Sequence, residues 1–195
     1  RFVSPVGVFS RLFKDAAGFF IERQPDGTRY RYHPLDGSAS AGRLESVADR
    51  TGTKLAFSRD ALGLITEARD AFARVVTYFH DSEGRIESIL DFTGRRVSFG
   101  YDAAGDLVSV TSPAVLEMPT ENNFPDGVRT EYAYSSGFSD QRLNHNLLKV
   151  IDPREAASTK VPRVTVVYEE DTAKTTVDRV LSQEWDGTVA FEYES

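Results

Sequence analysis

The sequence contains no cysteine among its 195 residues. Disulfide frameworks, cysteine-based zinc sites and thiol nucleophiles are therefore excluded, and the redox compartment is left open. The chain also lacks any apolar run near the ~20 residues that a membrane helix requires, so we expect no direct membrane insertion. Its first residues, RFVSPVGVFSRLF, have neither the long apolar stretch nor the cleavage site of a signal peptide. We therefore expect any targeting signal to lie outside this chain.

Positive charge is also scarce. The 23 basic and 30 acidic residues give a net charge of -7 and an isoelectric point near 5.0. Nucleic-acid-binding proteins concentrate Lys and Arg, so this balance argues against a nucleic-acid partner. The shares of hydrophobic residues, 40%, and charged residues, 27%, are those of a folded soluble chain rather than a disordered one.

Glycine follows aspartate at regular distances along the chain. Of the 14 glycines, six stand three residues after an aspartate and four follow one directly. An aspartate at the first position of a turn accepts a hydrogen bond from the backbone N–H two residues on, while glycine adopts positive φ without a Cβ clash. These pairs therefore predict chain reversals throughout the sequence.

Short segments rich in β-branched and aromatic residues separate the central turns. Six or seven residues suit a strand of roughly 20 Å better than a packed helix. TKLAF, RVVTYF and RRVSF each place such residues at every second position, which predicts antiparallel hairpins with one apolar face. In RVVTYF, Val75 and Phe79 make the other face apolar too, so we expect that part of the sheet to be covered on both sides.

The turns also recur with a period of 21 residues, because Gly42, Gly63, Gly84 and Gly105 are evenly spaced. The stretches that begin at Gly42 and Gly84 are identical at ten of 21 positions. A third feature of the repeat is an apolar residue followed by another three positions later, as at Leu44 and Val47.

The middle copy, residues 63–83, is less regular. It keeps Asp70 but has Ala73 where the other copies have glycine. Its segment TEARDAFARVV contains good helix formers, with Ala68, Phe72 and Val75 at helical spacing. We nevertheless predict strands here, because neighbouring copies at the same phase do not alternate between strand and helix.

The repeat organisation predicts a single β domain over residues 1–195. Residues 1–41 form its leading hairpins and residues 42–105 its three phased repeats. Residues 106–195 form divergent repeats, into which 113–125 and 136–146 are inserted as loops.

The unit Gly-Arg-Leu-x-x-Val-x-Asp-x-x-Gly, followed by a strand ending in Tyr-Asp-x-x-Gly, resembles the YD repeat of the RHS superfamily. This superfamily includes Rhs polymorphic toxins, Tc-toxin B and C components, and teneurins. The copy at 84–105 is the most similar, because it keeps the pair Tyr101-Asp102. The good match covers about residues 24–112, and a looser one reaches the end of the chain.

Members of that superfamily build a long strip of antiparallel strands that spirals into a hollow shell. The shell encloses a toxic C-terminal domain in the bacterial toxins and belongs to an adhesion protein in teneurins. The resemblance therefore implies an all-β, strongly twisted or curved strip, a partial segment of such a shell. It also implies secretion or a cell-surface location, and partners that are the rest of the array or an enclosed C-terminal domain.

Toxin-type shells end in a self-cleaving segment rich in Asp-Pro-x-Gly. The segment Asp152-Pro153-Arg154-Glu155 resembles it only in its first two residues and lacks the glycine. We therefore expect no cleavage site in this chain.

No motif for catalysis or cofactor binding is present, so we expect neither enzymatic activity nor a cofactor. His33, His80 and His145 lack metal-ligand spacing and are interpreted as ordinary surface or strand residues. The repeated aspartates offer oxygens for calcium, yet each already has a turn to cap. A paired-carboxylate hydrolase ranks last, because nothing marks two acids as special.

Two sets of residues are candidates for function. The first holds the repeat turns: Asp49, Gly52, Asp60, Gly63, Asp81, Gly84, Asp91, Gly94, Tyr101, Asp102 and Gly105. The second holds aromatics with flat faces for stacking on sugar rings: Tyr30, Tyr32, Tyr132, Tyr134, Trp185 and Tyr193. Packing within the sheet is the commoner role of strand aromatics. A structural shell or scaffold segment is therefore the main prediction, and a carbohydrate-binding or adhesion module is the alternative.

Overall fold

The computed structural model describes residues 5–7, 9–116, 123–153, 161–185 and 188–192. The chain divides into two compact units, Arg1–Arg95 and Arg96–Ser195. The boundary falls inside the third predicted repeat. None of the described helices is long and apolar enough to cross a membrane.

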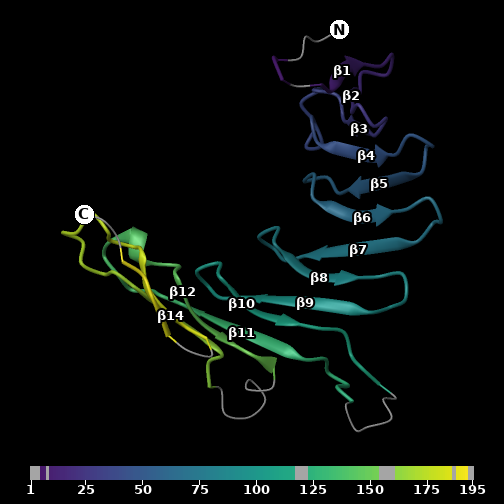
Figure 1. The fold of residues 1–195 in the computed structure, drawn as a ribbon. Coiled ribbons are helices and arrows are strands. Elements are labelled where there is room, and N and C mark those ends of the chain that lie inside the picture. The colour runs from purple at the N-terminus through teal and green to yellow at the C-terminus, as the bar shows by residue number, and fades with distance from the viewer. Residues whose placement is uncertain (1–4, 8, 117–122, 154–160, 186–187, 193–195) are drawn as a thin grey trace. The chain divides into compact units, whose positions relative to one another are not determined.

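The described residues of unit 1 form eight strands, each hydrogen-bonded to the next in sequence and all antiparallel (Figure 1). They are β1 (Arg11–Lys14), β2 (Phe20–Arg23), β3 (Arg29–Tyr32), β4 (Leu44–Ala48), β5 (Lys54–Arg59), β6 (Ile65–Arg69), β7 (Val75–His80) and β8 (Ile86–Leu90).

In the part of unit 2 that the structure describes, seven further strands have the same consecutive antiparallel pairing. They are β9 (Arg96–Tyr101), β10 (Leu107–Thr111), β11 (Arg129–Tyr134), β12 (Leu147–Ile151), β13 (Val164–Tyr168), β14 (Val180–Glu184) and β15 (Thr188–Ala190). A short 3-10 helix, η1 (Gln141–Leu143), lies in the connection between β11 and β12.

This architecture confirms the prediction of an all-β strip of antiparallel hairpins. The helix-like segment TEARDAFARVV is strand β6, a turn and the start of β7. Its strong helix formers are overridden because both strands find hydrogen-bonding partners on either side. Local helix propensity amounts to only a few tenths of a kcal/mol per residue, roughly, against a complete ladder of backbone hydrogen bonds.

Strand register gives each unit an apolar face and a polar face. Side chains alternate between the two sides of a strand, and residues directly opposite each other in neighbouring strands point to the same side. In unit 1, this pairing collects apolar side chains on one side of the sheet. This apolar face of unit 1 consists of Val47, Leu55, Phe57, Ala68, Val76, Tyr78 and Ile89.

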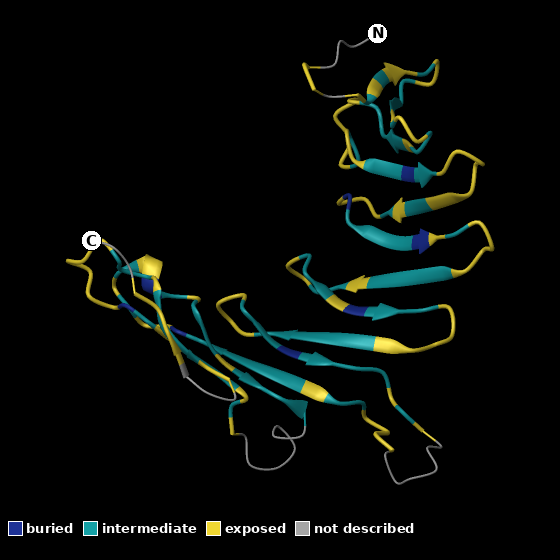
Figure 2. Cartoon of the chain, viewed as in Figure 1, coloured by how far each residue is buried: buried dark blue, intermediate teal, exposed yellow. Residues whose placement is uncertain are grey.

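The apolar face of unit 2 is built in the same way from β9 to β13. It includes Phe99, Val110, Tyr132, Val150 and Val164. The opposite face of each unit is richer in polar side chains, and buried serines such as Ser46, Ser88 and Ser109 lie in its strands. Figure 2 shows such buried residues as isolated dark blue segments on otherwise half-buried strands.

Each unit is a single layer of sheet over its described residues. Every strand contacts chiefly the strand next to it in sequence, and Ala68 and Leu143 are the only hydrophobic residues that count as buried there. Phe79 in β7 is 37% exposed. The expected second covering layer over RVVTYF is therefore not among the described residues.

Candidate functional site

The repeat turns share one hydrogen-bonding arrangement, which Asp60 illustrates. One carboxylate oxygen, Oδ1, accepts bonds from the backbone N–H groups of Leu62 and Leu64, each at 2.9 Å. The N–H of Gly63 donates to the Asp60 carbonyl at 3.0 Å, and the N–H of Asp60 donates to the Leu64 carbonyl. The carboxylate thus satisfies two backbone donors that the chain reversal leaves free of the sheet ladder.

The same two carboxylate bonds, at 2.8 to 3.0 Å, recur in the turns that begin at Asp49, Asp70, Asp81, Asp91 and Asp102. The fourth residue of each turn has a positive φ. It lies between 79° and 95° in the glycines, namely Gly52, Gly63, Gly84, Gly94 and Gly105. Ala73 adopts 62° at the corresponding position, which a Cβ atom disfavours.

The second carboxylate oxygen of three turns is held by an arginine four residues on. Asp91 Oδ2 lies 2.7 Å from Arg95, and Asp81 Oδ2 lies 2.7 Å from Arg85. The pKa of Asp91 is lowered by the hydroxyl of Thr93, which donates to the carboxylate, and by Arg95. At Asp81, desolvation raises the pKa, but the bonds from Arg85 outweigh it and the net shift is downward.

These bonds leave the aspartates poorly suited to calcium. Calcium takes six or more oxygens, whereas both oxygens of Asp70, Asp81 and Asp91 are already engaged. Across the described part of the chain, no three Asp, Glu or His residues are grouped as a metal site would need. One histidine lies beside an acid: His145 Nδ1 is 2.9 Å from Asp106 Oδ2.

A β-bulge explains the apolar spacing of three residues in the repeat. The pairing of β3 with β4 shifts by one residue between Arg31 and Tyr32 of β3. Tyr30 therefore lies opposite Val47, whereas Tyr32 lies opposite Leu44. One extra residue in the bulged strand brings Leu44 and Val47 to the same face.

The same shift recurs at the start of β6, β8, β10, β12 and β14. At β6, β8 and β10, the residue that faces the bulge directly precedes a turn aspartate. In the repeat with the Tyr-Asp pair it is Tyr101, opposite Leu107. In the two preceding copies Arg59 faces Ile65 and His80 faces Ile86. The Tyr-Asp motif alone marks Tyr101 in the sequence. The two apolar residues three positions apart are the signal for the bulge, which places Leu107 opposite Tyr101.

The four candidate tyrosines lie on strands and are half-buried. Tyr30 and Tyr32 lie in β3 and Tyr132 and Tyr134 in β11, and each pair alternates onto one face of its own unit. The Tyr32 hydroxyl donates to Glu22 at 3.3 Å. Desolvation, followed by the Glu22 charge, raises the pKa of Tyr32. These tyrosines therefore continue the apolar faces.

Trp185 differs from the tyrosines. It is 57% exposed and follows the end of β14, where the Arg163 guanidinium lies 5.8 Å from its ring centroid. Tyr193 lies outside the described residues.

One groove of about 530 Å³ crosses the apolar face of unit 1. Tyr30, Val47 and Leu55 form its floor, and Phe72, which is 78% exposed, lines its rim. Arg74 lies over Phe72, 5.4 Å from the ring centroid, and 5.2 Å from that of Phe92. In this groove a candidate tyrosine, Tyr30, shares a hollow with another aromatic ring, Phe72.

Comparison with known proteins identifies the repeat. The family model described as RHS Repeat matches residues 80–114, a stretch that holds the turns beginning at Asp81, Asp91 and Asp102. This chain contains an RHS repeat. The copies before residue 80 have the same turn and bulge geometry as the matched stretch.

Two solved structures are similar to this chain. The crystal structure of TcdB2-TccC3-Cdc42 has a TM-score of 0.49 and 13% identity, over 88% of this chain and 9% of the other. That of TcdB2-TccC3-TEV has a TM-score of 0.34 and 12% identity, over 83% and 9%. The chain thus spans about a tenth of the length of these two chains. No curated protein matches its sequence.

Proposed function

We propose that this RHS-repeat chain is a non-enzymatic wall segment of a larger secreted or cell-surface RHS-repeat protein. The observation that carries the proposal is the single-layer sheet, whose apolar faces no described element covers. A free-standing domain buries the apolar face of a sheet against a second layer. A strip that leaves this face uncovered is suited to a wall whose covering comes from other parts of the protein.

The covering part is the rest of the repeat array or an enclosed C-terminal domain, as the RHS resemblance implies. In this arrangement the apolar face looks toward the enclosed space. The face with Lys54, Ser58 and Glu67 looks toward solvent, since charged side chains are costly to bury. A toxin is one cargo that such a wall would enclose.

The engagement of the aspartates supports a role without catalysis. A general acid or base needs a carboxylate that is free to exchange a proton with substrate. In the repeat turns, Oδ1 accepts two backbone bonds, and arginines bind Oδ2 of Asp70, Asp81 and Asp91. The carboxylate oxygens of these aspartates therefore stabilise the turns.

The first test is the intact mass and negative-stain image of the native full-length product, purified from its source with an antibody to this segment. A much larger chain that forms a hollow particle is the expected result. A chain near 21.7 kDa without a cavity would overturn the wall proposal.

A pair of variants of that full-length product tests which face is covered. Leu55→Lys places a charge on the apolar face, and Ser58→Lys places the same charge on the opposite face of the same strand. We expect Leu55→Lys to reduce the yield of hollow particles and Ser58→Lys to leave it unchanged. Equal yields would contradict the inward assignment of the apolar face.

The groove on unit 1 supports a second candidate function, binding of a carbohydrate. Aromatic side chains such as Tyr30 and Phe72 stack on the apolar faces of sugar rings, and Asp49 and Thr53 add polar groups to the lining. Phe72→Ala is expected to abolish any signal on a glycan array. Phe92→Ala removes a similarly exposed ring outside the groove and is the control. An array without reproducible binding would remove this candidate.

A further inference from the structure

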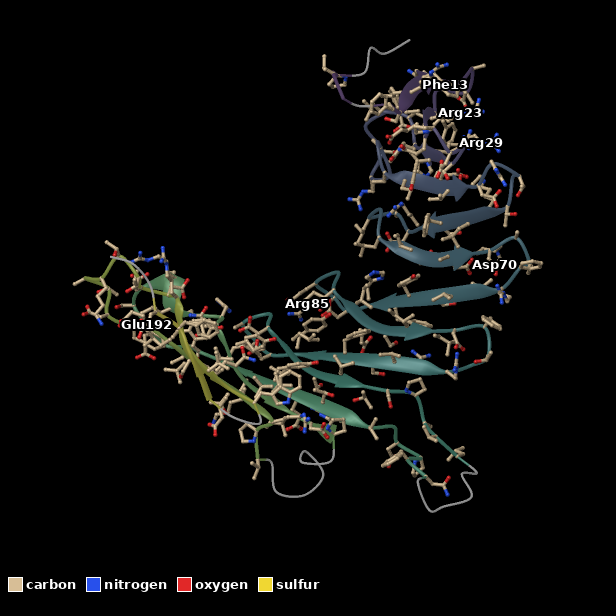
Figure 3. The ribbon with its side chains drawn as sticks, viewed as in Figure 1. Phe13, Arg23, Arg29, Asp70, Arg85 and Glu192 are labelled. Carbon is tan, nitrogen blue, oxygen red and sulfur yellow. The ribbon has the colours of Figure 1, made fainter. Side chains whose placement is uncertain are left out.

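Three arginines form a column across the first strands of unit 1. Arg11 of β1 lies directly opposite Arg23 of β2, which lies opposite Arg29 of β3. Figure 3 labels Arg23 and Arg29 in this region. Residues directly opposite in neighbouring strands have Cβ atoms about 5 Å apart, so the three positive charges share one side of the sheet. Tyr30 alternates to the other side, so the column belongs to the polar face.

This column carries no compensating acid. Within the described residues, the side chains of Arg11 and Arg23 form neither an ion pair nor a hydrogen bond, and that of Arg29 reaches only the carbonyl oxygen of Asp49, at 3.4 Å. Glu22, the nearest acid in sequence, accepts bonds from Gln24 and from Tyr32.

Four other arginines of unit 1 are each paired with an acid. Arg31, Arg74, Arg85 and Arg95 each lie within 3.2 Å of an aspartate. Like charges directly opposite each other in a sheet are destabilising. An uncompensated column in a chain of net charge -7 is therefore an unfavourable arrangement that an external anion would relieve.

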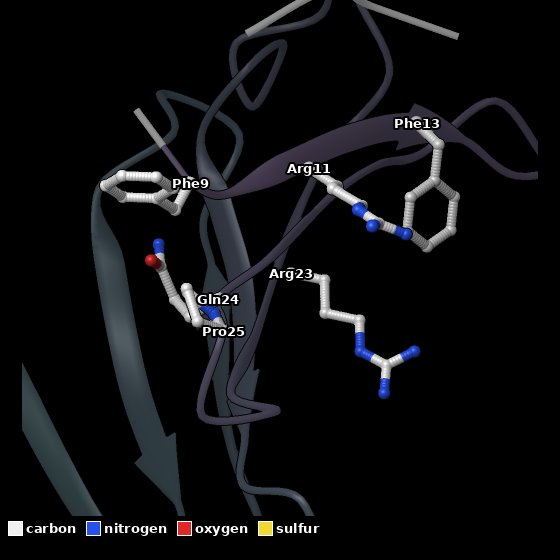
Figure 4. A pocket seen from close by; sticks show the side chains of 6 residues that line it. All are labelled: Phe9, Arg11, Phe13, Arg23, Gln24 and Pro25. Carbon is white, nitrogen blue, oxygen red and sulfur yellow. The ribbon is translucent and has the colours of Figure 1, made fainter. Parts of the chain in front are cut away.

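Two arginines of the column, Arg11 and Arg23, line a cavity of about 560 Å³ (Figure 4). Figure 4 shows Arg11, Arg23 and Phe13 gathered at one end, with Phe9, Gln24 and Pro25 at the other. A volume within roughly 300 to 1,000 Å³ is typical of sites for small molecules. The cavity therefore combines two free guanidinium groups with the exposed rings of Phe9 and Phe13.

We infer that this cavity binds a small phosphate monoester whose ester carries an aromatic or aliphatic body. Guanidinium groups bind phosphate oxygens through paired N–H donors, so Arg11 and Arg23 are matched in charge to a dianion. A phosphate monoester carries about -1.5 to -2 charges at pH 7. Phe9 and Phe13 provide apolar surface for the organic part. The site lies on the polar face and is separate from the groove and from the proposed wall function.

The test is calorimetric titration of the purified 195-residue chain with phenyl phosphate, and in parallel with inorganic phosphate, benzoate and benzyl alcohol. We expect phenyl phosphate to bind most tightly, inorganic phosphate and benzoate more weakly, and benzyl alcohol not at all. Affinity is expected to fall as salt rises, because the charges are exposed. Equal binding of phenyl phosphate and benzyl alcohol would overturn the assignment of an anion site.

Variants locate the site. Arg23→Gln is expected to weaken phenyl phosphate binding by about tenfold or more, the effect of losing hydrogen bonds to a charged group. Arg11→Gln, on the outermost described strand, provides a second variant should Arg23→Gln fold poorly. Arg163→Gln changes the net charge equally but lies in unit 2 and is expected to bind as the unaltered chain does. Unchanged affinity in folded Arg23→Gln and Arg11→Gln would refute the proposal.

Discussion

The two units use the short aspartate turn to different extents. From β4 to β8 in unit 1, and from β9 to β10 in unit 2, five-residue connections join successive strands, and each is shaped by one aspartate and one residue of positive φ. In unit 2, the connection from β11 to β12 is long and includes η1.

There the buried Ser135 side chain takes the place of the turn aspartate: its hydroxyl donates to the Leu143 carbonyl and accepts from the N–H of Asn146 at 3.0 Å. Asn146 in turn donates to Asp178 at 2.7 Å. The strands of the sheet can therefore be joined by a short local turn or by a longer loop, provided that side chains satisfy the backbone groups at the ends of the connection.

The largest effect is expected from crowding a short turn. In Gly63→Ala, the new Cβ would collide with the Ala39 carbonyl and would sit at φ 80°, so we expect a loss of about 3 kcal/mol in the free energy of unfolding. Gly52→Ala has similar φ but open space around it, and about 1 kcal/mol is expected. Urea denaturation followed by circular dichroism compares the two. Equal losses would show that φ alone sets the cost.

The next effect tests the loop of unit 2. Ser135→Ala removes both bonds of a buried hydroxyl and leaves the Asn146 N–H without that acceptor, so a loss of about 2 kcal/mol is expected. Hydrogen exchange should show faster exchange at Asn146, with little change in the turns of unit 1. Ser136→Ala, at an exposed neighbouring position, is the matched control. Uniform acceleration across both units would contradict a local role for Ser135.

The irregular turn offers a gain in stability. Ala73→Gly relieves a positive φ that alanine disfavours, and about 1 kcal/mol of stabilisation is expected. Ala71→Gly, two residues earlier in the same turn, is the control and should not stabilise, because glycine there only increases the freedom of the unfolded chain. Thermal unfolding measures both variants. A destabilised Ala73→Gly would mean that φ is not what limits this turn.

The smallest effect concerns acid. Bonds from Thr93 and Arg95 lower the pKa of Asp91 in the folded chain. A lowered carboxylate pKa contributes stability above the unfolded pKa, near 3.9, and this contribution is lost as the pH falls through the folded value. Arg95→Gln should therefore shift acid unfolding to slightly higher pH, as followed by circular dichroism. Arg50→Gln, in the turn that begins at Asp49, is the control and should leave the acid transition unchanged. Identical acid transitions would show that the arginine adds nothing.

Much of the fold was predictable because its determinants are local. Aspartate and glycine at fixed spacing predict the turns, and alternation predicts the strands between them. The period of 21 residues even corrected the helical appearance of TEARDAFARVV. The bulges were less visible: the spacing of Leu44 and Val47 records them, but their position opposite Tyr32 depends on how two strands pair. Likewise, the arginine column requires the register of three strands, which no single segment of sequence contains.

The sequence by itself determined the all-β class, the repeat period, the turn chemistry and the resemblance to RHS proteins, since each depends on residues close together in the chain. Tertiary structure decided three further features: which residues share the apolar face, which arginines are left without acids, and that the described sheet is a single layer. These depend on register and on contacts between strands. Burial of an apolar face is a property of everything that surrounds it, so no local pattern of residues could specify it.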